Sequence, residues 1–192
     1  LVKRYAGGQR PTFEPADATA EADRPDSEID VAELRLGWST LNNTHDFYPL
    51  IHRLGVGRLQ AMRLAGQEFA YPVARDAYAQ AIRRMAEEEI PFMAFVGNPG
   101  CIQIHSGLAK KIVDLEAWFN VFDPDFNLHV RTSAMAECWA VRRPTEAHGD
   151  IWSLESFDPT GQNVLSLFGV RKRDNPNSLK WMADFERVLK GV

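Results

Sequence analysis

One histidine, His45, stands where an imidazole can keep a lone pair free for a metal. It follows Thr44, a good N-cap residue, and opens an amphipathic stretch that predicts a helix over residues 45–54. In the first turn of a helix, the positive end of the helix dipole disfavours the imidazolium form. A neutral ring at this position is a candidate ligand for iron or zinc. The alternative is a partly exposed histidine at a helix start that binds nothing.

The other histidines do not complete a metal cluster with His45. His52 lies two turns further along the same predicted helix, about 10 Å away, which is too far to share one zinc ion. His105 falls in a predicted strand on the face of Gln103, where we expect it to be exposed, and His148 falls in a predicted loop. The sequence has no HExxH, GxSxG or Walker motif and no GxGxxG after a strand, which argues against a zincin, an α/β-hydrolase and a nucleotide-binding fold.

The composition indicates one globular domain with a tail. The chain has 192 residues, of which 45% are hydrophobic and 25% charged, enough to build a sizeable core. The net charge is −4 and the basic residues are scattered, so we expect no nucleic-acid partner. No apolar run has the length of a membrane span and no signal-peptide pattern opens the chain, which predicts a cytoplasmic protein without membrane insertion. Cys101 and Cys138 lack CxxC spacing and are expected to be buried, reduced thiols.

The pattern changes from helical to strand-like near Pro91, and this order predicts an α+β fold. N-terminal helices come first, a large antiparallel sheet meander follows, and a C-terminal helix ends the chain. The hydrophobic spacing predicts a helix of about ten residues from Ser27 and further helices over 45–54, 58–65, 76–89 and 177–189. Alternating or continuously apolar runs predict strands over 92–96, 101–105, 110–114, 118–122, 127–131, 134–143, 151–158 and 163–170.

The first 26 residues differ from the rest of the chain. There is no initiator methionine, and proline, alanine and acidic residues dominate positions 12–25. Such a composition cannot bury enough apolar surface to order itself. We therefore expect residues 1–26 to be a mobile interdomain linker and residues 27–192 to form the domain. The missing methionine suggests a piece of a longer protein.

Two long runs of residues together resemble a known family. Residues 95–107 read FVGNPGCIQIHSG and residues 118–129 read WFNVFDPDFNLH. The match continues through VRRPT at 141–145, SLESFD at 153–158 and LFGVRK at 167–172. On these motifs the chain resembles the cytoplasmic haemin-degrading and haem-trafficking proteins of bacterial haem uptake, of the HemS, HmuS, ChuS and PhuS type. Members of that family have two homologous halves, and this chain resembles the carboxy-terminal half together with the linker.

The resemblance assigns roles to residues of this chain. It implies that His45 is the axial ligand to haem iron, with Asn43 in place of the family's usual Asp, a change that could alter the hydrogen bond orienting the ring. It implies that Arg58 binds a haem propionate, because a guanidinium can bind a carboxylate with two parallel hydrogen bonds. Further residues implied at the haem site are Phe95, for which core packing is an equal alternative, His129, Arg143 where relatives often carry Lys, Phe168 where a Tyr is common, and Arg171.

The implied cofactor is non-covalent haem, and the implied function is to sequester and transfer haem in the cytoplasm. A haem-degrading oxygenase is the second interpretation, and a purely structural repeat is the third. Family pockets are completed by an arginine from the amino-terminal half, so we expect oxygen activation to suffer more than binding in this chain. A haem importer or a haem oxygenase is the kind of partner implied, and two copies of the isolated half could close the site as a homodimer.

Overall fold

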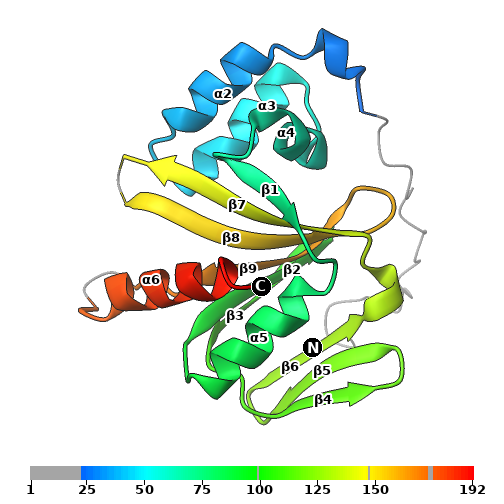
Figure 1. Ribbon diagram of the computed structural model, residues 1–192, viewed down its shortest axis with the longest axis vertical. Helices are drawn as coiled ribbons and strands as arrows, with labels where there is room; N and C mark the ends of the chain where they lie inside the picture. The colour runs from blue at the N-terminus through cyan, green and yellow to red at the C-terminus, as the bar shows by residue number, and fades with distance from the viewer. Residues whose placement is uncertain (1–22, 99, 147, 173–174) are drawn as a thin grey trace, which may run out of the picture.

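The computed structural model describes residues 23–98, 100–146, 148–172 and 175–192. It confirms the α+β fold, with helices first, antiparallel strands after them and a helix at the end. Three helices gather at one end of the molecule, and a small three-stranded sheet lies at the other (Figure 1). None of the helices described is both long and apolar enough to span a bilayer. The helical elements are η1 (Asp26–Glu28), α2 (Val31–Ser39), η2 (Thr44–Asp46), α3 (Phe47–Leu54), α4 (Arg58–Ala65), α5 (Ala77–Glu87), η3 (Thr132–Ala134) and α6 (Ser178–Leu189).

The predicted linker falls mainly outside the described residues, which begin at Asp23. Its last four residues, 23–26, contact the domain. The side-chain amide of Gln60, in α4, donates hydrogen bonds to the backbone carbonyl of Arg24 at 2.6 Å and to the carboxylate of Asp26 at 2.7 Å. Contacts with the helices therefore begin just before the predicted start of the domain.

The strands form two antiparallel sheets in place of the single predicted meander. The large sheet has the strand order β1-β7-β8-β9-β2-β3, and the small sheet has the order β4-β5-β6. Every second residue of β6 is buried, which is typical of a sheet with one solvated face. The residue pattern thus indicated strands without indicating which strands pair. The strands are β1 (Ala70–Val73), β2 (Phe92–Asn98), β3 (Cys101–Gly107), β4 (Ile112–Leu115), β5 (Trp118–Asp123), β6 (Phe126–Arg131), β7 (Glu137–Thr145), β8 (Gly149–Phe157) and β9 (Asn163–Gly169).

One face of the large sheet, the covered face, packs against α5, α6 and the small sheet. Successive side chains of a strand point to opposite faces, so alternate residues of β2, β8 and β9 share this side. They belong to one buried cluster with residues of both helices and of β5. Its fully buried members include Phe92, Leu154 and Leu167 from the sheet, Ile82 from α5, Phe185 from α6 and Phe119 from β5.

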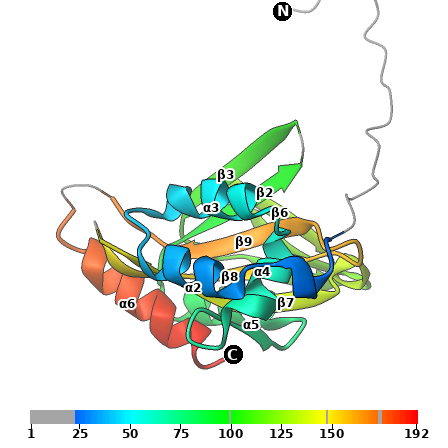
Figure 2. The same ribbon diagram turned by 90° about the horizontal axis from the view of Figure 1, so that it is seen from above.

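The opposite face of the large sheet is covered over only part of its width. Helices α2, α3 and α4 pack on β1, β7 and the end of β8 in a second buried cluster that includes Trp38, Val141 and Phe157. Over β9, β2 and β3 the same face stays open, and this region is called the open face below. Ile102 and Ile104 of β3 are 60% and 56% exposed there. In the view of Figure 2, the β2–β3 hairpin extends beyond the helices.

One strand was missed and two local predictions were wrong. Strand β1 was not predicted, because Pro72 disfavours a strand. It is an edge strand, where a residue without an N–H group is tolerated. The first α-helix begins at Val31 and not at Ser27, since the Asp30 side chain accepts a hydrogen bond from the backbone of Glu33 and caps the helix there. The apolar spacing that predicts the last helix also predicts that Leu179 packs inward against the sheet, yet Leu179 is 78% exposed.

Candidate functional site

The open face forms the floor of a cavity of about 1220 Å³, which exceeds the volume of about 300–1,000 Å³ that is usual for small-molecule sites. Its walls come from η2, α3 and the start of α4, from the ends of β7 and β8, and from α6. Six of the seven residues singled out in the sequence line this one cavity. They are His45, Arg58, Phe95, Arg143, Phe168 and Arg171.

The seventh residue, His129, lies elsewhere. It belongs to β6 of the small sheet, where its Nδ1 is 2.8 Å from the side-chain oxygen of Asn120 and its ring is 5.2 Å from that of Phe122. It does not line the cavity. Its motif runs through β5 and β6, which pair with each other and not with the large sheet.

His45 lies in the short 3₁₀ turn η2 that precedes α3, and not in the first turn of an α-helix. The cap is Asn43 and not Thr44, since the Asn43 side chain accepts a hydrogen bond from the backbone N–H of His45 at 2.8 Å. The carboxylate of Asp46 accepts from the backbone and side-chain amides of Asn43 at 2.9 and 3.1 Å. Asn43 donates that second bond through its amide, which an aspartate could not do. These contacts fix the backbone on both sides of His45.

The ring of His45 makes no hydrogen bond to any residue that the structure describes. Within the same described residues, no group of three or more His, Cys, Asp or Glu side chains is placed to hold a metal ion. A free divalent ion in a protein usually takes three or more protein ligands. A single imidazole suits a metal that arrives with its other ligands already in place.

The floor of the cavity is apolar and built from neighbouring strands. Phe95 of β2 lies opposite Ile104 of β3 and Ser166 of β9, and Met93 lies opposite Phe168. The rings of Phe95 and Phe168 meet edge to face at 5.2 Å. Both rings are only half-buried, so they offer a broad apolar surface to a ligand.

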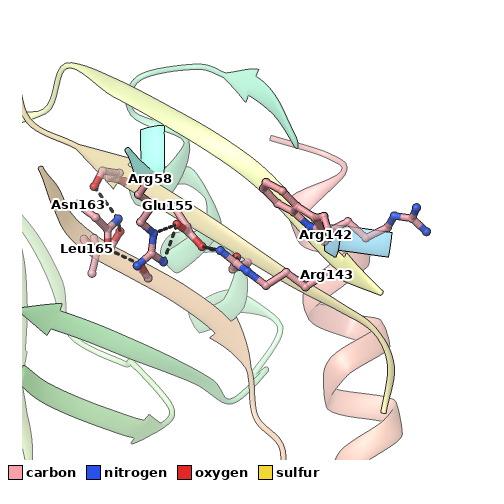
Figure 3. A network of polar contacts seen from close by, with 10 residues as sticks. Arg58, Arg142, Arg143, Glu155, Asn163 and Leu165 are labelled. Atoms are coloured by element: carbon pink, nitrogen blue, oxygen red, sulfur yellow. Dashed lines mark hydrogen bonds and ion pairs between the residues drawn. The ribbon is translucent and has the colours of Figure 1, made fainter. Parts of the chain in front are cut away.

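Arg58 begins α4, lines the cavity and points to a carboxylate that is buried behind the cavity wall. Its Nε and Nη2 atoms each lie 2.8 Å from Oε2 of Glu155 on β8, as Figure 3 shows. The Arg58 side chain is 31% exposed, whereas that of Glu155 is fully buried. A guanidinium that keeps part of its surface in the cavity can also contact an anion there.

Arg143 holds Glu155 from the other side. Its Nη2 donates to Oε1 of Glu155 at 2.8 Å and its Nη1 donates to Ser153 at 2.9 Å, while its guanidinium covers the ring of Phe47 at 4.4 Å. Burial raises the pKa of the Glu155 carboxyl, but the charges of Arg143 and Arg58 outweigh that effect and hold this pKa well below its usual range. Burial also lowers the pKa of the Arg143 guanidinium, and Glu155 opposes this. Arg143 is 3% exposed, so it lines the cavity mainly as support for its neighbours.

Two features of the site were missed or misjudged from the sequence. Glu155 received no role, although a carboxylate in the middle of an apolar strand must find partners when buried, and that was the available signal. Cys101 was expected to be buried with Cys138, yet it is exposed and lines the cavity at the β2–β3 turn, while Cys138 is buried as predicted. Arg171 follows β9 and is exposed at the rim.

The profile of the haemin-degrading HemS/ChuX domain matches residues 55–188, which is more than half of the chain. The chain belongs to this family. The matched region takes in Arg58, the large sheet and α6 except its last residue, and it begins ten residues after His45. The hemin transport protein HmuS of Yersinia pestis is 34% identical over 172 residues, which cover 90% of this chain and 49% of HmuS.

Solved structures of HemS/ChuX relatives show the same fold. Holo-PhuS, a heme-binding protein from Pseudomonas aeruginosa, matches with a TM-score of 0.84 and 41% identity over 93% of this chain and 49% of PhuS. ChuS, an E. coli heme oxygenase, matches with a TM-score of 0.74 and 30% identity over 90% of this chain and 52% of ChuS. The chain thus spans about half the length of the relatives that it matches.

Proposed function

We propose that this chain binds haem in the cavity over the open face and sequesters it for transfer, with His45 as axial ligand and Arg58 beside a propionate. The observation that carries the proposal is the lone His45 imidazole at the wall of a large cavity with an apolar floor. The similarity to HmuS, a hemin transport protein, and to PhuS, a heme-binding protein, supports it.

The residues of the cavity fit haem in three respects. Haem is a flat apolar disc with two carboxylates and an iron that takes an axial base. Phe95 and Phe168 supply an apolar floor, His45 supplies the base, and Arg58 and Arg171 supply cations in the wall and at the rim. When bound, haem would supply the iron, and this chain would supply one ligand to it through His45.

Transfer is favoured over degradation by the exposure of the floor. Ile102 and Ile104, which continue the apolar surface of Phe95 across β3, are more than half exposed. A ligand on this surface keeps contact with solvent and can exchange with a second protein. Degradation is the alternative function, and the specific observation in its favour is the similarity to ChuS, a heme oxygenase.

A spectral titration with haemin tests the binding proposal. The wild-type chain should give a saturable Soret band, and His45→Ala should lose the shift that marks axial imidazole ligation while keeping the fold, because a residue in an exposed turn contributes little packing energy. His52→Ala is the matched control, since His52 is an exposed histidine of the adjacent α3. An unchanged spectrum in His45→Ala would refute the assignment of His45.

The second half of the experiment separates transfer from degradation. Ascorbate is added to the haem-loaded protein under air, and the Soret band is followed with time. We expect the band to persist and haem to pass to apomyoglobin, a general haem acceptor. Decay of the band with release of iron or a bile pigment would assign degradation to this chain.

The partner, the location and the oligomeric state follow from the proposed haem transfer. A haem importer or a haem oxygenase is the partner class that we propose for the transfer step, and the cytoplasm is the proposed location. A homodimer that closes the cavity predicts one haem per two chains and a doubled mass on addition of haemin, which light scattering measures.

A further inference from the structure

The most unusual group near the cavity is the carboxylate of Glu155, which lies behind the wall residues Arg58 and Arg143. It is fully buried, and two guanidinium groups and a hydroxyl contact it (Figure 3). Its Oε1 accepts hydrogen bonds from Ser153 at 2.9 Å and from Arg143 at 2.8 Å. A buried carboxylate with these partners has little freedom to move, because any rotation breaks charge-assisted hydrogen bonds that water cannot replace there.

The other oxygen of this fixed carboxylate holds Arg58. Both Nε and Nη2 of Arg58 lie 2.8 Å from Oε2. An arginine side chain has many rotamers, and holding one of them in solvent costs conformational entropy. In this protein the ion pair with Glu155 orders the Arg58 side chain before a ligand binds. An anion that enters the cavity therefore finds the guanidinium already in place, and binding loses less conformational entropy.

The cluster of Arg58, Arg143 and Glu155 carries a net positive charge and can therefore attract an anion. Arg58 and Arg143 carry one positive charge each and Glu155 carries one negative charge, which leaves one positive charge uncompensated. Arg143 is 3% exposed, whereas Arg58 is 31% exposed, so the accessible part of this charge lies on Arg58. A partly desolvated guanidinium binds a carboxylate more strongly than a fully exposed one does.

We propose that Glu155 is a positioning residue for ligand binding: it holds the Arg58 guanidinium in the orientation that receives a carboxylate of the bound porphyrin. The inference rests on the proposed haem function. It adds a residue that does not line the cavity and reaches the ligand only through Arg58.

Two substitutions of Glu155 distinguish its role in positioning Arg58 from the effect of its negative charge. Glu155→Asp keeps the negative charge, but the side chain is one methylene shorter and cannot bridge both arginines. Glu155→Gln keeps the length and removes the charge. The measurement is the ratio of the affinities for haemin and for its dimethyl ester, which lacks the free carboxylates. We expect Glu155→Asp to lower this ratio about tenfold, the loss expected for one charge-assisted hydrogen bond, with little change in affinity for the ester.

The same experiment excludes a role in charge balance alone. If Glu155 only neutralised the arginines, Glu155→Asp would keep the wild-type ratio and Glu155→Gln would bind free haemin more tightly, because the wall would gain a positive charge. That result overturns the proposal. In the variant Arg58→Ala, the further change Glu155→Asp should have no additional effect on the ratio, since Glu155 would then have nothing to position.

A loss of stability must not be mistaken for a loss of positioning. Ile82→Ala is the matched control, because Ile82 is fully buried in the cluster on the covered face, on the other side of the large sheet from Glu155. It should lower the stability and leave the ratio unchanged. Should Glu155→Asp fail to fold, Ser153→Ala removes one hydrogen bond from Oε1 and should lower the ratio about threefold. A wild-type ratio in Ser153→Ala would then overturn the proposal.

The outcomes also distinguish this inference from the proposed function. A wild-type chain that binds haemin and prefers it to the ester, with normal ratios in the Glu155 and Ser153 variants, refutes the positioning role alone. A wild-type chain without a Soret shift refutes the haem function, and the positioning role fails with it.

Discussion

The covered face and the open face of the large sheet are built by the same strands, yet they differ in what their side chains contact. On the covered face, Phe92, Leu154 and Leu167 are completely buried against α5, α6 and the small sheet. On the open face, positions of β2 and β9 that point to the other side carry Phe95 and Phe168, which are half-buried. An apolar side chain that folding leaves partly in water gains more by contacting a ligand than one already in the core. The covered face therefore stabilises the fold, and the open face is available for binding.

The largest expected difference between the faces concerns two phenylalanines of β2. Phe92→Ala should lower the free energy of unfolding by about 3–5 kcal/mol, because it leaves a cavity in the core, and should leave haemin affinity unchanged. Phe95→Ala should cost only about 1 kcal/mol of stability and weaken haemin binding. Urea unfolding and haemin titration of both variants measure this. Equal losses of stability would mean that the open face is core as well.

A smaller difference is expected between the two arginines proposed to meet the ligand. Arg58→Ala should weaken haemin binding by about 1.5–3 kcal/mol, since its guanidinium lies partly desolvated in the wall. Arg171 is exposed at the rim, so Arg171→Ala should weaken binding much less, and added salt should abolish its effect first. Titrations at low and high salt compare the two variants. A larger loss in Arg171→Ala would move the carboxylate contact to the rim.

The smallest effect concerns His105, on the covered side of β3. The sequence suggested an exposed ring, but His105 stacks on Phe126 of β6 at 3.6 Å and is partly buried, because the small sheet covers this end of the strand. Burial lowers the pKa of its imidazole below the usual value of about 6.5. As the pH falls below that value, the unfolded chain takes up a proton before the folded chain does, so stability decreases with acidification.

The variant His105→Gln tests this contribution to stability. It should lose the part of the acid destabilisation that sets in below about pH 6.5, which urea midpoints measured across that range would show. His52→Gln is the matched control for replacing a histidine, because His52 is exposed on α3. If His105→Gln retains the wild-type pH dependence, the ring titrates normally and is not held by the small sheet.

Local sequence patterns predicted most helices and strands but not which strands pair with one another. Helix α4 was placed with its observed bounds, and the strands predicted over 92–96 and 101–105 are the two strands of the β2–β3 hairpin. The separate small sheet was not predicted, because alternation shows that a strand has a buried face without showing which strand lies beside it. The edge strand β1 was missed because Pro72 is unfavourable in most strands.

The residues of the site could be predicted where a sequence motif contains them, but not where a contact between distant segments defines their role. Six of the seven residues taken from the family motifs line one cavity, and His129 does not, because its hairpin pairs within the small sheet. Glu155 could not be linked to Arg58 from the sequence, since 97 residues separate them and only the approach of α4 to β8 joins them. The sequence predicted the side chains that meet a ligand better than those that hold them in place.

Nuclear magnetic resonance of the labelled chain with haemin tests most directly whether the open face is the binding face. Ferric iron broadens nearby amide signals. We expect signals of Gly97, Ser166 and Phe168 on or beside the open face to broaden on addition of haemin, while those of Ile82 in α5 and His129 in the small sheet persist. Broadening centred on His129, with the signals of Gly97 and Ser166 unaffected, would place haem on the small sheet and contradict the account.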